Sequence, residues 1–183
     1  MGALRVEDAY PRYSYDDYVN WEGRWELIDG IAYAMSPMPL IKHQSISGNI
    51  YEQLREILKE CSLCKALLPV DWKINDETIV QPDNLVICHK PRNEAYLTKA
   101  PVVIFEVLSK STAKKDTTVK FELYQFEGVK YYIIVDPNEK LAKVYELKDG
   151  RYIKVGDFED EKATFKLDKC KKELEFDFKR IWD

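Results

Sequence analysis

The sequence predicts one domain, residues 1–183, of mixed α/β (α+β) architecture, with a central mixed β-sheet flanked by helices and added β-hairpins. The length of 183 residues is close to that of a single domain. Two strongly apolar runs, PVVIFEVLS at 101–109 and KYYIIVDP at 130–137, are typical of strands buried on both faces. A helical segment separates them, and this order predicts a crossover between parallel strands.

The first part of the chain contains signals for a short helix and a hairpin. Ser14 and Asp17 have the spacing of a capping box, which predicts a short helix at this point. Asp29-Gly30 lies between two short apolar-rich runs and is the strongest local signal for a hairpin turn. The proline-rich segment SPMPLIK at 36–42 is expected to be a loop.

The middle of the chain changes from a helix to strands. Apolar residues recur at helical spacing over 43–59 and predict an amphipathic helix with one buried stripe. Residues 67–74 and 78–88 are predicted strands joined by a turn. Pro82 interrupts the second strand because its ring removes a ladder donor. A polar loop then leads to the first apolar run.

The last part of the chain combines the crossover helix with further strands. A helix is predicted over 117–126, with Val119, Leu123 and Phe126 on one side and Gly128 as its C-cap. Short strands are expected on both sides of the turn Lys148-Asp149-Gly150, at 142–147 and 152–155. The final segment, LEFDFKRIW at 174–182, is expected to fold back on the core.

The charge balance limits the kind of partner. The chain carries 28 Lys and Arg against 32 Asp and Glu, for a formal net charge of −4. A protein that binds nucleic acid over a wide surface usually has the opposite sign, so any contact with phosphates must come from a local basic patch. The sequence shows no secretory signal and no apolar run of about 18 residues that could cross a bilayer. We therefore expect a cytoplasmic protein with no membrane partner.

The sequence contains four cysteines, at positions 61, 64, 88 and 170. In a reducing cytosol we expect free thiols packed within the fold. Cys61 and Cys64 form a C-x-x-C pair, but a structural zinc site would need a second pair, and Cys88 and Cys170 are isolated in the sequence. The sequence therefore favours packed thiols over a zinc site.

Glu106 is the most informative single residue because it interrupts VVIFEVL, the most apolar strand of the chain. An ionised carboxylate in an apolar interior costs several kcal/mol unless it is paired, hydrogen-bonded or bound to a cation. A glutamate at a strand end could instead reach solvent or a lysine, but apolar residues flank this position on both sides. We therefore expect an uncompensated, functional carboxylate, whose replacement by alanine leaves the stability unchanged or raises it in metal-free buffer.

Two further residues gain meaning beside Glu106. Asp83 follows Pro82, and a proline within a strand implies a bend that can direct the next side chain into a cleft. Lys120 lies in the crossover helix, one residue off the apolar stripe. Alone, Asp83 is a turn residue and Lys120 a solvated lysine. Together with Glu106 they would form an oxygen-rich site suited to Mg²⁺ or Mn²⁺ and to phosphate chemistry.

Several short motifs follow one another along the chain: WELIDGIAYAMSP at 25–37, HQSISGNIYEQL at 43–54, QPD at 81–83, FEVLS-x-S-T at 105–112, D-x-x-x-K-x-x-x-Y at 116–124 and YYIIVDP at 131–137. Their order resembles the PD-(D/E)xK nuclease superfamily and, within it, the Uma-type restriction-endonuclease family. The resemblance extends from about residue 15 to residue 152 and implies a restriction-endonuclease-like core. It also implies metal-assisted hydrolysis of phosphodiester bonds, with DNA as the expected substrate.

The resemblance also implies roles for the residues already singled out. Asp83 and Glu106 match the two acidic metal ligands, and the backbone carbonyl of Val107 would be a third ligand of Mg²⁺ or Mn²⁺. The lysine that usually stands two residues after the second acid is absent, because Leu108 occupies that position. In this family its role is thought to pass to the following helix, where Lys120 is the matching residue.

Three other residues match further catalytic positions of the family: Glu26, His43 and Gln44. Each also has an ordinary structural explanation. Glu26 could be a cross-strand partner in the hairpin, and the other two could be helix caps or surface polar residues.

The segment KSTAKKDTTVK at 110–120 would suit a neighbouring phosphate, because it places four lysines directly after the Glu106 strand. The helix N-terminus near Thr117 and Thr118 could also bind an anion. Such charge runs are more often simply solvated. A homodimer would suit a nuclease that cuts both strands by symmetry. Two other functions stay open: a catalytically idle binding or assembly module of the same fold, and a metal-dependent hydrolase of another phosphoester.

Overall fold

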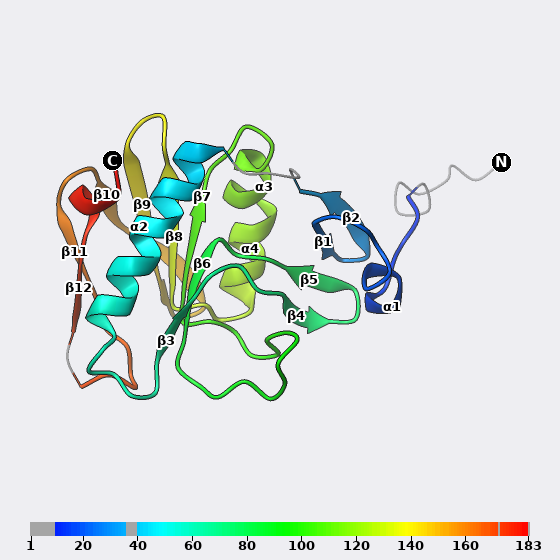
Figure 1. Cartoon of the computed structure of the whole chain (residues 1–183), viewed down its shortest axis with the longest axis horizontal. Coiled ribbons are helices and arrows are strands. Elements are labelled where there is room, and N and C mark those ends of the chain that lie inside the picture. The colour runs from blue at the N-terminus through cyan, green and yellow to red at the C-terminus, as the bar shows by residue number, and fades with distance from the viewer. Residues whose placement is uncertain (1–9, 36–39, 172, 183) are drawn as a thin grey trace.

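A six-stranded mixed sheet forms the centre of the structure (Figure 1). The computed structural model describes residues 10–35, 40–171 and 173–182. Within these residues the strand order is β10-β9-β8-β7-β6-β3, and β7 runs parallel to β8 as predicted for the two apolar runs. The strands are β3 (Lys65–Leu67), β6 (Asn84–Ile87), β7 (Val103–Val107), β8 (Tyr131–Asp136), β9 (Leu141–Lys148) and β10 (Arg151–Phe158).

Two smaller sheets, ordered β2-β1-β5-β4 and β11-β12, lie beside the central sheet. The predicted hairpin joins β1 to β2, where Asp29 and Gly30 have φ angles of 48° and 75°. A two-residue turn of type I′ requires positive φ at both positions, so this prediction is confirmed. The strands are β1 (Trp25–Ile28), β2 (Ile31–Ala34), β4 (Trp72–Asn75), β5 (Thr78–Val80), β11 (Lys162–Phe165) and β12 (Leu174–Asp177).

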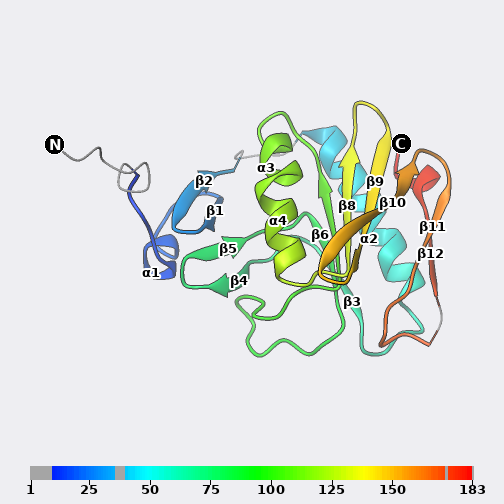
Figure 2. The ribbon, with the colours of Figure 1, turned by 180° about the vertical axis from the view of Figure 1, so that it is seen from behind.

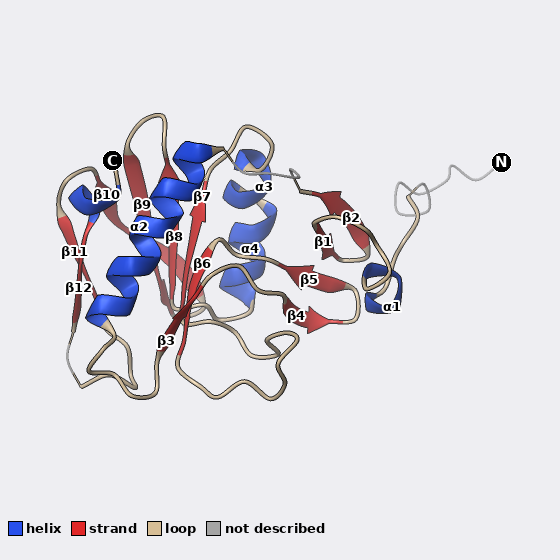
Figure 3. Cartoon of the chain, viewed as in Figure 1, coloured by secondary structure: helices blue, strands red, loops and turns tan. Residues whose placement is uncertain are grey.

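Helices cover both faces of the central sheet (Figure 3). Seen from behind, α3 and α4 lie in front of the sheet and α2 lies on its other side (Figure 2). The predicted long helix begins two residues early, and positions 36–39 of the predicted proline-rich loop lie outside the described residues. No helix in the described part of the chain is long and apolar enough to cross a membrane. The helices are α1 (Tyr15–Tyr18), α2 (Ile41–Ile57), α3 (Ala113–Thr117), α4 (Val119–Phe126) and the 3₁₀ helix η2 (Phe178–Ile181).

Strand β7 separates two hydrophobic core layers. Phe105 belongs to the layer that contains Ile50 of α2, whereas Ile104 belongs to the layer that contains Tyr124 of α4. Because successive side chains of a strand point to opposite faces, Glu106 points to the same side as Ile104. The alternation therefore directs the carboxylate toward α4. The C-terminal segment packs in the α2 layer through Phe176, Phe178 and Ile181, as predicted.

The two predicted strands of the middle region are each divided between different sheets. Residues 67–74 form parts of β3 in the central sheet and β4 in the small sheet, on either side of Pro69. The prediction of one continuous strand there is wrong. Residues 78–88 form β5 and β6, on either side of the predicted interruption at Pro82. Proline cannot donate a ladder hydrogen bond, so pairing ends at each proline and the chain crosses between sheets.

The buried face of the crossover helix differs from the predicted one. Val119 and Phe126 are 38% and 86% exposed, whereas Lys120 and Tyr124 are 2% and 0% exposed. The predicted apolar stripe is therefore wrong. The helical segment also begins earlier than predicted, with α3 at Ala113. The polar face turns inward because it meets buried carboxylates from neighbouring strands, which the spacing of apolar residues cannot reveal.

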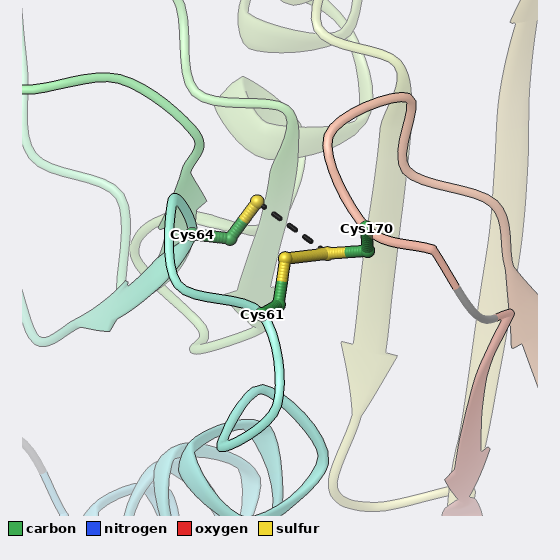
Figure 4. Close-up of side chains that lie close together, drawn as sticks. All are labelled: Cys61, Cys64 and Cys170. Carbon is green, nitrogen blue, oxygen red and sulfur yellow. Dashed lines mark hydrogen bonds between the residues drawn. A yellow bond between two sulfur atoms is a disulfide. The ribbon is translucent and has the colours of Figure 1, made fainter.

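The four cysteines lie close together, and Figure 4 shows three of them. The structure joins Cys61 to Cys170 and Cys64 to Cys88 in disulfides, so the expectation of free thiols is wrong for this structure. Cys61 and Cys64 follow α2, Cys88 follows β6, and Cys170 lies between β11 and β12. The partners are 109 and 24 residues apart, and this distance along the chain concealed their proximity.

Gly128 ends α4 as predicted. Its φ is +82°, and its backbone N–H donates to the carbonyl of Gln125 while that of Val129 donates to Tyr124. This pair of bonds is a Schellman motif, which needs a left-handed residue after the helix. A Cβ built on Gly128 would meet no atom within 4 Å, so the requirement for glycine is conformational rather than steric.

We predict that Gly128→Ala lowers the free energy of unfolding by about 1 kcal/mol, because an L-residue is strained at positive φ. Gly48→Ala is the matched control. Gly48 lies in the interior of α2, and a Cβ there would also meet no atom within 4 Å. That substitution should raise the stability by about 0.5–1 kcal/mol. Denaturant unfolding measures both values, and equal effects would contradict the assignment of the cap.

Candidate active site

Strands β6 and β7 bring Asp83 and Glu106 together. The antiparallel register pairs Asn84 with Phe105, so Asp83, one residue earlier, lies beside Glu106, one residue later. The Asp83 carboxylate also accepts a hydrogen bond of 2.9 Å from the backbone N–H of Val107. This bond fixes the carboxylate at the end of β7. The bend at Pro82 therefore places Asp83 beside Glu106, as the sequence predicted.

Lys120 lies at the centre of a buried group of carboxylates. Its Nζ is 2.8 Å from Oε1 of Glu106 and 2.7 Å from Oε1 of Glu26. The nearest oxygen of Asp116 is 3.4 Å away. All four side chains are almost completely buried. The structure thus brings the predicted Lys120 and Glu26 to Glu106, on the side of β7 that faces α4.

Glu26 connects the small sheet to this group. Its second carboxylate oxygen forms an ion pair with Lys115 of α3. Its Oε1 also accepts a hydrogen bond of 2.9 Å from the backbone N–H of Gln81. The side chain of Gln81 continues the polar contacts to Tyr18 and Asp71. Glu26 is therefore more than a cross-strand partner, because it contacts two lysines of the crossover helices.

The sequence prediction left out two residues of the same helical face. Asp116 and Tyr124 lie four residues before and after Lys120, so all three project from one side of α3 and α4. The hydroxyl of Tyr124 donates a 2.8 Å hydrogen bond to Glu106, and the hydroxyl of Tyr132 holds the backbone carbonyl of Asp116. The D-x-x-x-K-x-x-x-Y spacing was the signal that could have identified both residues.

His43 joins the site from the start of α2. Its Nε2 is 3.2 Å from Oδ2 of Asp83. The helix is held there by Asn84, which exchanges hydrogen bonds of 2.9 and 3.1 Å with the side chain and backbone of Ser47. Gln44, by contrast, is exposed, and the described residues show no side-chain hydrogen bond from it to the other candidates. The structure therefore brings His43 to Asp83 but does not bring Gln44 there.

Mutual charge interactions shift the titration of the buried lysine and its partners. Burial alone would lower the pKa of Lys120, but the charges of Glu106, Glu26 and Asp116 outweigh it and raise the pKa well above its usual value. Burial favours a higher pKa for Glu26, yet Lys120 and Lys115 lower it. Lys120 is thus an ammonium and Glu26 a carboxylate at neutral pH.

The other two carboxylates are less well compensated. Burial raises the pKa of Glu106 well above its usual value, against the opposing charge of Lys120. Burial likewise raises the pKa of Asp116. Burial also works against charging His43, but hydrogen bonds to Asp83 and to the backbone of Val107 raise its pKa. The site therefore contains more carboxylates than cations. Lys115 and Lys120 lie beside Glu26, and His43 lies beside Asp83.

The expectation that Glu106 is an uncompensated buried charge is wrong, because Lys120 and Tyr124 both contact it. Removing the carboxylate would leave an ammonium and a hydroxyl without one partner, so a neutral or stabilising Glu106→Ala is no longer expected. The hydroxyls of Thr117 and Thr118 donate to carbonyls of α3. Thr118 is the N-cap of α4, so it lies at a helix start as expected, but both hydroxyls are already hydrogen-bonded back to α3.

Asp83, Glu106 and Val107 form an oxygen-donor set that fits a divalent cation. The hydrogen bonds that Glu106 accepts from Lys120 and Tyr124 both fall on Oε1, which leaves Oε2 for another ligand among the described contacts. His43 interacts with both Asp83 and the backbone of Val107, so these two residues already face one group that can carry positive charge. The residues present thus suit hard cations such as Mg²⁺ or Mn²⁺.

The fold and the grouped acids and lysine agree with the restriction-endonuclease-like class that the motifs predicted. The chain belongs to the Uma2 family, described as "Putative restriction endonuclease", which matches residues 12–177. This match confirms the resemblance inferred from the motifs.

A solved structure shows the same fold. It is described as "a putative nuclease belonging to DUF820" from Anabaena variabilis ATCC 29413 and is similar with a TM-score of 0.69. The match covers 92% of this chain and 97% of that chain at 18% sequence identity, so it supports the fold class alone. A comparison with functionally curated proteins finds no match.

We predict that Lys120→Met lowers the free energy of unfolding by about 3–5 kcal/mol at pH 7, because it leaves buried carboxylates without their cation. Methionine keeps most of the side-chain length, so packing is largely retained. The pKa values of Glu106 and Asp116 are already raised by burial and should rise further. Acids with a raised folded-state pKa stabilise the fold at low pH, so the deficit should shrink as the pH falls.

Lys114→Met is the matched control, because Lys114 is an exposed lysine of α3. Its effect should stay within about 0.5 kcal/mol, as for most surface substitutions. Denaturant unfolding at several pH values measures both variants. Equal losses of stability, or a Lys120→Met deficit independent of pH, would contradict the central role of this ammonium.

Proposed function

We propose that the protein is a divalent-metal-dependent endonuclease that hydrolyses phosphodiester bonds in DNA. The observation that carries this proposal is the meeting of Asp83 and Glu106 beside Lys120, in a chain of the restriction-endonuclease family. Each residue alone has an ordinary structural explanation. Their convergence at the end of β7 is what favours phosphoryl chemistry.

Asp83, Glu106 and the carbonyl of Val107 would hold the cation, either Mg²⁺ or Mn²⁺. When bound, the cation supplies a polarised phosphate and a more acidic water. The residues of the chain keep these ligands in place. The Val107 N–H orients Asp83, and Lys120 and Tyr124 orient Glu106.

Lys120 would act as a fixed positive charge rather than as a base. Its pKa is raised by the three acids around it, so it keeps its proton at neutral pH. An ammonium can orient a water and offset negative charge that develops on a phosphate, but it cannot accept a proton. The raised pKa of Lys120 therefore favours the orienting role over that of a general base.

A small set of cations borders the site and suits a DNA backbone. Lys110 and Lys114 are exposed in the segment that follows β7. Arg24 lies close enough to lower the pKa of His43 and to reach the side chain of Gln81 at 3.4 Å. With a net charge of −4, the protein should bind DNA through this local patch alone and weakly in the absence of metal.

We predict that the wild-type protein cuts plasmid DNA with Mn²⁺ or Mg²⁺, and that Asp83→Asn and Glu106→Gln lower the rate at least about 100-fold. A metal contact in a transition state is worth several kcal/mol, and 1.36 kcal/mol corresponds to a factor of ten. The asparagine and glutamine side chains each keep an oxygen that can accept the hydrogen bonds that the carboxylates of Asp83 and Glu106 accept. The loss would therefore report on charge rather than on folding.

Glu122→Gln is the control for these variants, because Glu122 is an exposed acid of α4 two residues from Lys120. It should cut at the wild-type rate. Persistent cutting by both site variants would overturn the proposed site. Hydrolysis of a generic phosphodiester without cutting of DNA would instead favour the hydrolase of another phosphoester.

We further predict that the wild-type protein binds Mn²⁺ at neutral pH, and that Asp83→Asn abolishes this binding. Isothermal titration calorimetry measures it directly and does not depend on knowing the substrate. Binding should also strengthen as the pH rises through the titration of Glu106, because the metal competes with protons for the carboxylate. A folded wild-type protein without Mn²⁺ binding and without cutting would favour the idle binding or assembly module.

A further inference from the structure

The four cysteines form a compact group at the opposite end of α2 from His43, and Figure 4 shows Cys61, Cys64 and Cys170 of this group. The Sγ atoms of Cys61, Cys64 and Cys170 all lie within 4.8 Å of one another, and those of Cys64 and Cys170 are 3.6 Å apart. Cys88 is bonded to Cys64, so its sulfur belongs to the same group. Two independent disulfides have no reason to meet, whereas a metal site requires four sulfurs at one point.

We propose that the four thiolates of Cys61, Cys64, Cys88 and Cys170 bind one Zn²⁺ as a structural site in the reduced protein. Zinc bound by four cysteines is tetrahedral with Zn–S distances of about 2.3 Å, which places the sulfurs about 3.8 Å apart. The 3.6 Å separation of Cys64 and Cys170 is close to this value. The other sulfur pairs reach it by rotation of side chains once the disulfides are reduced.

The local backbone supports the proposal. Cys61 and Cys64 have the C-x-x-C spacing of zinc sites, and a turn hydrogen bond of 3.2 Å from the Cys64 N–H to the Cys61 carbonyl holds them together. Both side chains are buried, at 8% and 6% exposure. A closed, four-sulfur site leaves no position for a substrate or water, which is the pattern of structural rather than catalytic zinc.

The charge around the group also fits. Four thiolates and one Zn²⁺ carry a net charge of −2, which nearby cations would stabilise. Every cysteine has a lysine within two positions in the sequence, and these lysines are exposed: Lys59, Lys65, Lys90, Lys169 and Lys171. Two acids, Glu60 and Asp168, lie equally near in the sequence, so the lysines are in excess and partly offset the charge of the thiolates.

The disulfides seen here and the zinc site are alternative states of the same four residues. Two molecules of a dithiol reduce the two disulfides, give four thiols and become two cyclic disulfides. Zn²⁺ then displaces four protons and forms four Zn–S bonds. A nuclease that acts on DNA inside a cell would work in a reducing compartment, where structural disulfides are rare. This last argument rests on the proposed function, whereas the geometry does not.

The site would hold three separate parts of the fold together. The cysteines come from the end of α2, the end of β6 and the connection between β11 and β12. The backbone N–H and carbonyl of Asp177 in β12 also exchange hydrogen bonds with the Gln53 side chain of α2. Zinc would thus complete the attachment of the small β11–β12 sheet to the long helix.

The test is to reduce the purified protein with a dithiol, add Zn²⁺, remove unbound metal by dialysis and count zinc by atomic emission. We expect one zinc per chain, released when a mercurial reagent titrates the thiols. Co²⁺ in place of zinc should give the intense visible absorption of a tetrahedral thiolate site. A protein with four reactive thiols that retains no zinc, or gives no such cobalt spectrum, would overturn the proposal.

Variants locate the metal independently of nuclease activity. Cys88→Ser and Cys170→Ser should each lose zinc, whereas Ser62→Ala, an exposed change between the two paired cysteines, should keep it. The cobalt spectrum of the wild type gives a result even if a cysteine variant misfolds. Glu106→Gln should keep full zinc content, so a zinc-binding protein that fails to cut DNA refutes only the nuclease. Zinc retained by both cysteine variants refutes only this site.

Discussion

The ammonium of Lys120 is the group on which the arrangement of the site depends. It lies between the carboxylates of Glu26, Glu106 and Asp116, which come from the small sheet, the central sheet and α3. Each acid would bear a large desolvation cost without a cation beside it. The desolvation cost of burying the Lys120 ammonium is in turn offset by the charges of these acids. One charge therefore holds three elements at the place where Asp83 and Glu106 meet.

This dependence makes the small sheet a part of the site. Glu26 reaches the crossover helices through Lys115 and Lys120, and the backbone N–H of Gln81, the residue after β5, also donates to it. Polar contacts between separate elements, rather than one apolar core, therefore hold the site together. Such an arrangement is more sensitive to the loss of a single charge than to the loss of a methyl group, because a buried unpaired ion costs more than a small cavity.

Physical patterns explain which features the sequence could reveal. The runs around Glu106 and at β8 were predictable because strands buried on both faces are apolar throughout. The Asp29-Gly30 turn was predictable because few residues adopt positive φ. The buried face of α4 was not, because Lys120 faces inward only through charges brought by distant strands. The cysteine group was hidden for the same reason, since its members come from three separate segments.

The three-residue link between β5 and β6 leaves no slack for insertion or deletion. Gln81 holds Glu26 through its N–H, and Asp83 holds the N–H of Val107 on the next strand. One added residue would shift β6 by a single position and turn each of its side chains to the opposite face of the sheet. Length is therefore under stricter constraint here than amino-acid identity, in contrast to the loop at 89–96, which precedes the buried Leu97.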